Sequence, residues 1–173
     1  MEWRHRLFLN QDLLGDRAAD IRGALGLLRT YAALPRQAFL ADQTVLSAAK
    51  YQLIVAIEAA QAICNHLAAR VARRAPSSYA DCYRILGESG VLPPDLAARL
   101  ADMAKFRNVL IHRYASVDDN RVHEIMNRDL GDLEEFLAAV HAFVTDAAVR
   151  EASGGEDRAP TGRVDDRKRS DDP

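Results

Sequence analysis

Apolar residues recur at the spacing of an α-helix in two long runs near the start of this 173-residue chain. The first run occupies residues 11–34 and ends at Pro35, because proline interrupts a helix. The second occupies residues 42–73 and is followed by Pro76. Each run therefore predicts one amphipathic helix. The expected inner faces consist of Leu14, Ala18, Ile21, Leu25, Leu28 and Ala32 in the first helix, and of Val45, Ala49, Val55, Ala59, Ile63 and Leu67 in the second.

Capping residues and prolines predict the next two helices. Ser78 followed by Asp81 resembles a helix start, and this helix is expected to stop near the glycines of residues 87–90. Residues 93–95, two prolines and an aspartate, predict another start, since proline suits the first turn and an acid favours the positive end of the helix dipole. That helix is expected to continue to about Tyr114.

The remaining part of the body follows SVDDN, a turn-rich connection. A short helical piece is expected from about Arg121, and it leads into a final amphipathic helix. The apolar residues of that helix are Leu130, Leu133, Leu137, Val140, Val144 and Ala147. The composition is 49% hydrophobic but only 6% aromatic, and alanine and leucine, the strongest helix formers, are abundant. We therefore predict an all-α fold, an antiparallel bundle of four or five helices.

The composition changes at the C-terminal end of the chain. Residues 1–150 are expected to form one helical domain, whereas residues 151–173 form a polar tail that is expected to be disordered. This tail holds seven acidic and five basic side chains, so it accounts for the whole formal net charge of −2. The body is neutral. Overall charge therefore gives no support for nucleic-acid binding, although it does not exclude a local basic site.

Cysteine usage and hydropathy indicate the cellular compartment. The two cysteines, Cys64 and Cys82, are too few for a disulfide framework and fit a reducing cytosol. The N-terminal segment MEWRHRLFLNQ lacks the long apolar core of a signal peptide. No window of the sequence approaches the length of uninterrupted apolar residues that a membrane span needs. We expect a soluble, cytoplasmic protein.

The sequence offers little support for a metal or another cofactor. Cys64 and His66 lie about 200° apart on a helix, so they cannot chelate one ion together. Cys82 belongs to a separate segment, and His123 and His141 stand without neighbouring ligands of suitable spacing. Glycine-rich phosphate loops and hydrolase motifs are also missing from the sequence. Buried thiols and ordinary helix histidines are the expected outcome.

The stretch FRNVLIHRY, residues 106–114, places polar residues in a segment that otherwise reads as a buried helix. On an ideal helix Arg107 lies near the middle of an apolar arc, where an unpaired guanidinium is costly. This arc consists of Leu96, Leu100, Met103, Leu110, Ile111 and Tyr114. Asn108 and His112 form a stripe on its flank, and Arg107 and His112 diverge by about 140°, too far to hold one small group comfortably. Two copies of the helix packed about a two-fold axis would bring them to one cleft and cover the arc.

Glu58 is an acidic residue in the strongly apolar run VAIEAAQAI. It either pairs with a buried arginine, such as Arg107, or lies on a flank of its helix that faces water. The exposed position is the default for a lone acid. The pairing would follow the rule that buried charges are normally paired.

With these residues in view, the chain resembles the HEPN superfamily, and within it the HepT-type ribonuclease toxins of two-gene toxin–antitoxin modules. Those proteins carry an R-x4-H motif that the HepT branch extends to R-x4-H-x-Y, and RNVLIHRY, residues 107–114, matches it completely. The resemblance also covers FLADQTVLSAAKYQLIVAIEAAQAICNHL, SYADCYRILGESGVLPPDLAARLADMAKFRN and YASVDDNRVHEIMNRDLGDLEEF. It extends over roughly residues 12–147, and the flanking segments make it far more specific than R-x4-H alone.

The resemblance implies a homodimeric, metal-independent endoribonuclease with a composite site between its protomers. His112 is expected to act as general base or acid on the ribose 2′-hydroxyl or the leaving oxygen. Arg107 is expected to hold the scissile phosphate and stabilise the charge that builds on it. Asn108 is expected to orient the His112 ring or to bind substrate. The expected product is a 2′,3′-cyclic phosphate end.

The resemblance also implies a type VII module, in which a nucleotidyltransferase antitoxin of the MntA type transfers AMP units to the motif tyrosine. Tyr114 is then the expected acceptor, and the added phosphates would oppose RNA entry by charge and bulk. The structural alternative is a buried Tyr114 that caps the end of the bundle. A different function also stays open: a non-catalytic, substrate- or partner-binding subunit of a minimal nucleotidyltransferase. The neutral body favours that reading, since non-specific RNA affinity depends on basic contacts.

Overall fold

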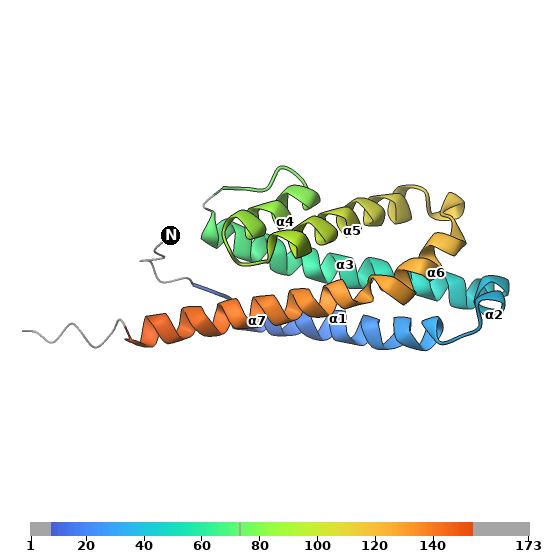
Figure 1. Ribbon diagram of the computed structural model, residues 1–173, viewed down its shortest axis with the longest axis horizontal. Coiled ribbons are helices and arrows are strands. Elements are labelled where there is room, and N and C mark those ends of the chain that lie inside the picture. Colours follow the sequence, from blue (N-terminus) through green and yellow to red (C-terminus); the bar gives the residue numbers. More distant parts are fainter. Residues whose placement is uncertain (1–7, 73, 154–173) are drawn as a thin grey trace, which may run out of the picture.

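A computed structural model describes residues 8–72 and 74–153, and every regular element among them is a helix (Figure 1). Four long helices, α1, α3, α5 and α7, form the body of the bundle, and three shorter ones lie between them in the chain. The bounds are α1 Gln11–Ala32, α2 Arg36–Ala41, α3 Gln43–Val71, α4 Tyr79–Glu88, α5 Pro94–His112, α6 Asp119–Arg128 and α7 Leu130–Ser153, with a 3₁₀ turn η1 at Tyr114–Ser116. The predicted all-α bundle is confirmed.

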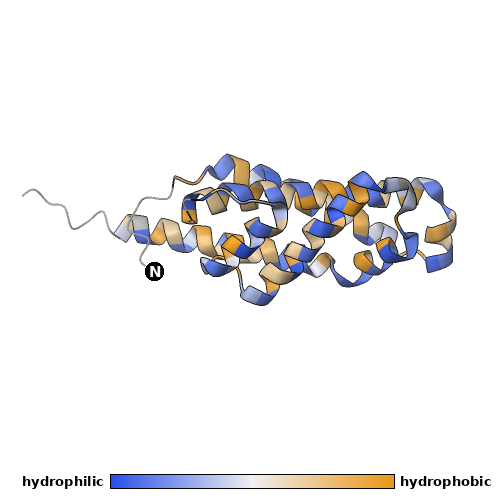
Figure 2. Ribbon diagram, turned by 90° about the horizontal axis from the view of Figure 1, so that it is seen from above, coloured by the Kyte–Doolittle hydropathy of each residue, from blue (hydrophilic) through white to orange (hydrophobic). Residues whose placement is uncertain are grey.

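Helix α3 is central to the packing. In Figure 1, α1 and α7 lie along one side of α3, whereas α4 and α5 lie along the other. Hydrophobic and hydrophilic residues alternate around the helices, as Figure 2 shows, and the hydrophobic ones fill a continuous core. Among its fully buried members are Ile21, Leu28, Phe39, Leu46, Leu53, Ile63, Leu67, Tyr83 and Phe136. Burial of this apolar surface is the main stabilising contribution to the fold.

Both of the first two predicted helices begin at a side-chain cap. The Asn10 side chain accepts a hydrogen bond from the backbone N–H of Leu13 at 3.0 Å. Asp42 accepts from the N–H groups of Thr44 and Val45 at 2.9 and 3.1 Å. These contacts satisfy backbone donors that the first helical turn leaves without partners. The two long helices are thereby confirmed with the predicted starts.

The connection between these helices contains an element that the periodicity did not predict. Helix α2 has only six residues and begins directly after Pro35. A helix this short cannot display a full amphipathic repeat, so the sequence pattern carries little signal for it. Its one buried side chain, Phe39, inserts into the core and packs against the ring of His123, with the centroids 5.4 Å apart.

Helix α4 starts and stops where the sequence predicted. Ser78 accepts a hydrogen bond from the N–H of Asp81 at 3.1 Å, and Gly90 follows the helix with a positive φ of 74°. Gly87 is required by packing, because a Cβ there would lie 2.9 Å from the Cβ of Ala97. The missing side chain lets α4 approach α5 closely. This contact fixes the two helices that flank the candidate site.

The prediction that α5 reaches Tyr114 is wrong by two residues. The last helical residue is His112, Arg113 leaves the helical region with φ −130° and ψ 31°, and Tyr114 begins the η1 turn. Helix α6 begins at Asp119, two residues earlier than expected, because Asp118 caps it by accepting from the N–H of Asn120 at 2.9 Å. The direction of the Tyr114 side chain is therefore set by the η1 turn rather than by α5.

The C-terminal expectations are only partly covered by the described residues. Helix α7 continues to Ser153, three residues past the predicted end of the helical domain. The rest of the predicted disordered tail, residues 154–173, lies outside the described residues. Within the described ranges, no helix combines the length and the apolar character needed to cross a lipid bilayer.

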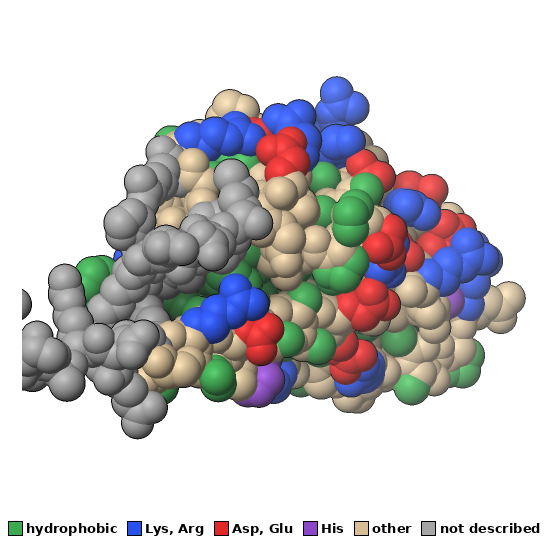
Figure 3. All heavy atoms as spheres, turned by 60° about the vertical axis from the view of Figure 1, so that its left-hand side comes forward, with side chains coloured by type: hydrophobic (Ala, Val, Ile, Leu, Met, Phe, Trp, Pro, Cys, Tyr) green, Lys and Arg blue, Asp and Glu red, His purple; other side chains and the backbone are tan. Residues whose placement is uncertain are grey.

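Charged side chains of both signs are interspersed over the face of the molecule shown in Figure 3. In the bundle as a whole, some charged side chains form ion pairs between helices: Arg99 of α5 binds Glu135 of α7 at 2.7 Å, and Arg29 of α1 binds Glu134 of α7 at 2.5 Å. These pairs are solvent-exposed, so each stabilises the bundle only modestly. The mixed surface agrees with the neutral charge of the body.

Candidate functional site

The Arg107 side chain lies between α5, α3 and the start of α4, and only 17% of it is exposed. Its Nε donates to a carboxylate oxygen of Glu58 on α3, in an ion pair. Its Nη1 donates to the side-chain oxygen of the neighbouring Asn108 at 3.1 Å. The guanidinium carbon lies 4.8 Å from the ring centroid of Tyr79, in a cation–π contact. These partners offset the cost of removing a guanidinium from water.

The pairing of Glu58 with Arg107, one of the two alternatives, is confirmed, and the side chain also lies on a flank that is partly open to water. The Glu58 side chain is 37% exposed while it binds Arg107. The pair therefore lies at the edge of the bundle and is partly screened by water. An acidic group at this position can hold the arginine without closing the site to solvent.

Asn108 and His112 are both exposed on α5. Asn108 was expected to orient the His112 ring or to bind substrate; in the structure its side-chain oxygen accepts from Arg107 instead of contacting the His112 ring. His112 forms no hydrogen bond or ion pair with any residue in the described part of the chain. Its ring nitrogens are thus available to a ligand or a second protein chain.

Arg107 and His112 do not converge within a single chain. Arg107 points toward α3 and α4, as its contacts show, whereas His112 is exposed at the last position of α5. Their divergence by about 140° on the helix is thereby retained in the folded protein. In one chain, Arg107 and His112 therefore lie on different faces of α5, and each face carries one half of the predicted cleft.

Tyr114 is 41% exposed and does not cap the bundle as a buried residue. Its hydroxyl donates to the backbone carbonyl of Ser47 on α3 at 3.3 Å. The Lys50 ammonium lies 5.2 Å from the Tyr114 ring centroid and 3.5 Å from its backbone oxygen. Lys50 is itself buried and pairs with Asp119 at 2.7 Å. The tyrosine is therefore held in place while its ring remains accessible.

Helices α3 and α5 run antiparallel along this site, because Ser47 contacts Tyr114 and Glu58 contacts Arg107. Three exposed apolar residues are named here the apolar strip. Tyr51 lies one turn after Ser47 on α3, Ile111 lies one turn after Arg107 on α5, and Tyr114 follows α5 in the η1 turn. The members of the strip are 61%, 40% and 41% exposed, respectively. Ile111 was expected in the apolar arc of the helix, and in one chain it is uncovered. An exposed apolar strip of this kind is typical of a protein–protein contact.

Two residues of the site were not predicted from the sequence: Tyr79 and Lys50. Tyr79 follows a recognisable helix start, but no sequence spacing connects it with Arg107. Lys50 carried a usable signal, because it shares one face of α3 with Leu46 and Leu53, both of which are buried. A lone lysine among buried positions indicates a charge with a specific partner.

The other residues that could carry chemistry have contacts that stabilise the fold. They are Cys64, Cys82 and His66. Cys64 and Cys82 are both fully buried, as predicted. Burial raises the pKa of the Cys64 thiol far above its ordinary range, and a hydrogen bond with Cys82 adds to the effect. His66 accepts a hydrogen bond from the N–H of Asn10 at 3.0 Å. In the described ranges there is no group of three or more His, Cys, Asp or Glu residues that could hold a metal ion.

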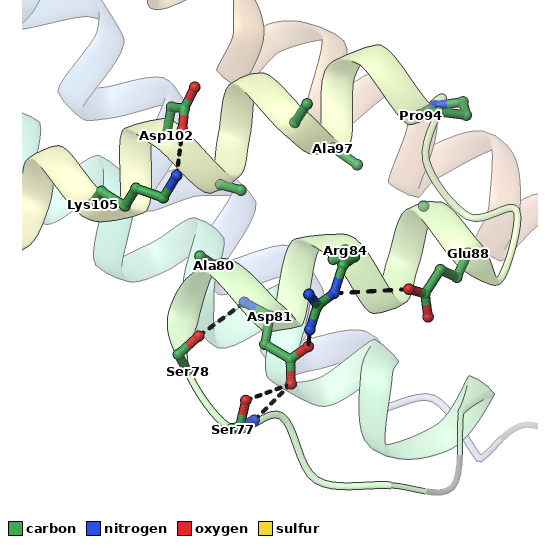
Figure 4. Close-up of a pocket in the computed structure, with 13 residues that line it drawn as sticks. Ser77, Ser78, Ala80, Asp81, Arg84, Glu88, Pro94, Ala97, Asp102 and Lys105 are labelled. Atoms are coloured by element: carbon green, nitrogen blue, oxygen red, sulfur yellow. Dashed lines mark hydrogen bonds and ion pairs between the residues drawn. The ribbon is translucent and has the colours of Figure 1, made fainter.

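A groove of about 540 Å³ lies between α4 and α5 (Figure 4). It is lined by alanines of both helices and by charged side chains, which are those of Asp81, Arg84, Glu88, Asp102 and Lys105. Neither Arg107 nor His112 lines it. This groove is therefore separate from the candidate site.

The all-α bundle, with R-x4-H at the end of α5 and the histidine exposed, is the arrangement expected from the resemblance to HEPN proteins. The family model described as ribonuclease HepT-like matches residues 21–140. The chain thus belongs to the HepT-like ribonuclease family, and this membership places it among the endoribonucleases. The resemblance inferred from the sequence is confirmed.

Individual relatives agree with this assignment. The chain is 25% identical over 104 residues to the mRNA nuclease HepT of Shewanella oneidensis, a match that covers 60% of this chain and 78% of the relative. A solved structure of a tri-AMPylated Shewanella oneidensis HEPN toxin in complex with MNT antitoxin has 22% identity and a TM-score of 0.71, covering 77% of this chain and 99% of that one. A MntA-containing toxin–antitoxin complex with a tyrosine-to-alanine mutation has 22% identity and a TM-score of 0.70, covering 75% and 98%. These two likenesses show the shared fold.

Proposed function

We propose that this protein is the metal-independent endoribonuclease toxin of a type VII toxin–antitoxin system. One observation carries the proposal: a fixed guanidinium at Arg107 and an uncommitted imidazole at His112 lie on either side of the exposed residue Ile111 on one helix. Arginine binds phosphate through paired N–H groups, and histidine exchanges protons near neutral pH. The site thus holds the two groups that RNA cleavage by its own 2′-hydroxyl requires.

The complete site forms in a homodimer. Two chains related by a two-fold axis near Ile111 bury their apolar strips and place Arg107 of one chain opposite His112 of the partner subunit. The geometry of a single chain supports this arrangement, because its two groups face different directions. Covering the strip also removes exposed apolar surface from water.

In the proposed reaction, Arg107 holds the scissile phosphate and His112 of the partner subunit takes the proton of the ribose 2′-hydroxyl. The 2′-oxygen forms a bond to phosphorus, and the bond from phosphorus to the 5′-oxygen breaks. That oxygen takes a proton from an imidazolium or from water. Arg107 stabilises the charge that develops on the phosphate oxygens. Asn108 binds substrate through the amide N–H groups that its contact with Arg107 leaves available.

Tyr114 is the proposed acceptor of AMP from an MntA-type nucleotidyltransferase, which is the proposed partner protein. Its hydroxyl would attack the α-phosphorus of a nucleoside triphosphate, with pyrophosphate as the leaving group. The partial exposure of Tyr114 supports this role. So does the fact that a HEPN toxin of the same fold is tri-AMPylated in its complex with MNT antitoxin. Each AMP adds negative charge and bulk beside the phosphate site.

Cleavage of total bacterial RNA in the presence of EDTA tests the nuclease. We expect the wild-type protein to cleave, and we expect Arg107→Ala and His112→Ala to lose activity while remaining dimers. His141→Ala, which removes an exposed histidine of α7, is the control and should keep full activity. If the wild-type protein leaves RNA intact, the non-catalytic binding subunit of a nucleotidyltransferase replaces the nuclease.

Subunit mixing tests whether the site is composite. Arg107→Ala and His112→Ala proteins are each inactive, but a mixed dimer contains one site with both groups intact. After random exchange, the mixture should recover about a quarter of the wild-type activity. No recovery in a mixture shown to contain mixed dimers would assign both groups to the same chain.

Co-expression with a nucleotidyltransferase of the MntA type tests Tyr114. The expected result is a mass increase in multiples of one AMP unit, abolished by Tyr114→Phe. Tyr51→Phe is a matched control, because Tyr51 is more exposed and lies on the adjacent helix. Retention of the mass increase in Tyr114→Phe protein would assign the modification to another residue.

A further inference from the structure

The Arg107 guanidinium is held from three helices at once. Glu58 of α3 binds Nε, Asn108 of α5 binds Nη1, and the ring of Tyr79 at the start of α4 covers one face of the planar group. A free arginine side chain samples many rotamers, and fixing it costs conformational entropy. In this protein the Arg107 side chain loses that entropy on folding, before any ligand binds.

The start of α4, which carries Tyr79, is itself firmly anchored. The Asp81 carboxylate is buried and accepts from the backbone N–H and the hydroxyl of Ser77 at 2.8 and 2.9 Å, and it also pairs with Arg84 (Figure 4). Close contact between Gly87 and Ala97 fixes the other end of α4 against α5. The Tyr79 ring is therefore placed over Arg107 by the fold rather than by a flexible loop.

These contacts leave the phosphate-binding edge of Arg107 open. A guanidinium has five N–H groups, of which Glu58 uses the one on Nε and Asn108 uses one on Nη1. Within the described residues, Nη2 has no hydrogen-bond partner. The remaining N–H groups can bind two oxygens of one phosphate in a forked arrangement. Glu58 thus orients the fork without occupying its outer edge.

We propose that Glu58 and Tyr79 are positioning residues that hold Arg107 in the orientation required at the scissile phosphate. This inference rests on the proposed ribonuclease function. Preorganised charge contributes most to catalysis, because it needs no rearrangement when the transition state forms. Glu58 acts through Arg107 by its acceptor oxygen, and Tyr79 acts by the face of its ring.

The acceptor oxygen and the negative charge of Glu58 have separable effects. Glu58→Gln keeps an acceptor for Nε and removes the charge, so the site becomes more positive and binds RNA more tightly in the ground state. We expect kcat to remain within about two-fold of wild type and KM to fall by about two- to five-fold. Glu58→Ala releases Arg107, and kcat should fall by about 10- to 100-fold.

Tyr79 variants separate ring stacking from the hydroxyl group. Tyr79→Phe retains the ring face and should keep kcat close to wild type. Tyr79→Leu removes the cation–π contact, and kcat should fall by about three- to ten-fold. Glu134→Ala is the control for loss of an acid that pairs with an arginine across two helices, and it should leave both constants unchanged.

Steady-state kinetics of the full-length protein on a mixed-sequence single-stranded RNA, labelled with a fluorophore and a quencher, measure these effects. The positioning role is supported if Glu58→Gln retains kcat while Glu58→Ala loses it. Equal loss in both variants, or no loss in Glu58→Ala, would overturn it.

A second measurement does not depend on cleavage. In ¹⁵N NMR spectra the Nε–H signal of Arg107, identified by its absence in Arg107→Lys protein, should be protected from solvent exchange in wild type and in Glu58→Gln. It should exchange rapidly in Glu58→Ala. An unprotected signal in wild type would refute the positioning role even in an active enzyme. If the wild-type protein cleaves no RNA, the proposed function fails, and protection of this signal still decides whether Glu58 fixes Arg107.

Discussion

Lys50 shows how a single buried charge connects the core with the surface of the site. Its ammonium lies below the Tyr114 ring and pairs with Asp119 at the start of α6. It is also 3.5 Å from the Tyr114 carbonyl oxygen, so it links α3 to the turn that carries the tyrosine. A buried lysine is tolerated only with partners of this kind. Lys50 thus supports the placement of Tyr114.

The substitution Lys50→Met tests this role. Methionine retains most of the apolar length but leaves the Asp119 carboxylate without its cation. The free energy of unfolding should fall by about 1 to 3 kcal/mol, a range that allows for the partial exposure of Asp119. Urea unfolding measures it. Lys105→Met is a matched control, because Lys105 pairs with Asp102 on the surface and should change stability by no more than about 0.5 kcal/mol. Equal effects of the two substitutions would contradict the role of Lys50.

At the scale of elements, the start of α4 depends on the charge of Asp81. Hydrogen bonds from Ser77, first from its backbone N–H, and the neighbouring Arg84 lower the pKa of Asp81 from 3.8 to about 2. A carboxyl whose pKa is lower in the folded than in the unfolded state stabilises the fold above its unfolded pKa. This contribution is present above about pH 4 and is lost as the pH falls toward 2.

The lowered pKa of Asp81 determines how the stability of Asp81→Asn, compared with wild type, should depend on pH. At pH 7 the variant should be less stable than wild type, and the difference should shrink between about pH 4 and pH 2, where wild type also loses the charge. Denaturant unfolding across this range measures the difference. Asp102→Asn, in which an exposed partner of Lys105 is replaced, should show a much smaller difference at every pH. A pH-independent difference for Asp81→Asn would assign its effect to packing.

The elements were largely predictable because their ends carry local chemistry. Asp42 and Ser78 each cap a helix through their own side chain, so the signal lies within a few residues. Asp118 also caps a helix, but it lies in a turn-rich segment, and the start of α6 was expected two residues later. The end of α5 carried no comparable signal, since no glycine or proline follows His112. The short α2 depends on burial of Phe39, which is a tertiary effect. Periodicity and capping thus predict the presence of a long helix better than the residue at which it ends.

At the scale of the whole molecule, the candidate site was predictable in its residue types and in one of the two alternatives for Glu58, but not in its other contacts. The motif identified Arg107, His112 and Tyr114, and the helical spacing predicted that the first two diverge. The partners Glu58 and Tyr79 come from α3 and α4, and only the packing of three helices brings them to Arg107. Contacts between distant segments leave no periodic trace in a single sequence. In the proposed dimer the second half of the site would come from a second chain, which is one step further from the information in a single sequence.

The dimer is the property of the whole molecule on which the proposed site depends, and Ile111→Glu tests it. In the proposed interface Ile111 lies near the two-fold axis, so the substitution buries two carboxylates beside one another. Light scattering should show a wild-type dimer and an Ile111→Glu monomer with an unchanged helical circular dichroism spectrum. RNA cleavage should be lost together with the dimer. Val149→Glu, at an exposed apolar position of α7, should leave both unchanged. A monomeric variant that retains full cleavage would show that one chain suffices, and a dimeric Ile111→Glu protein would place the interface elsewhere.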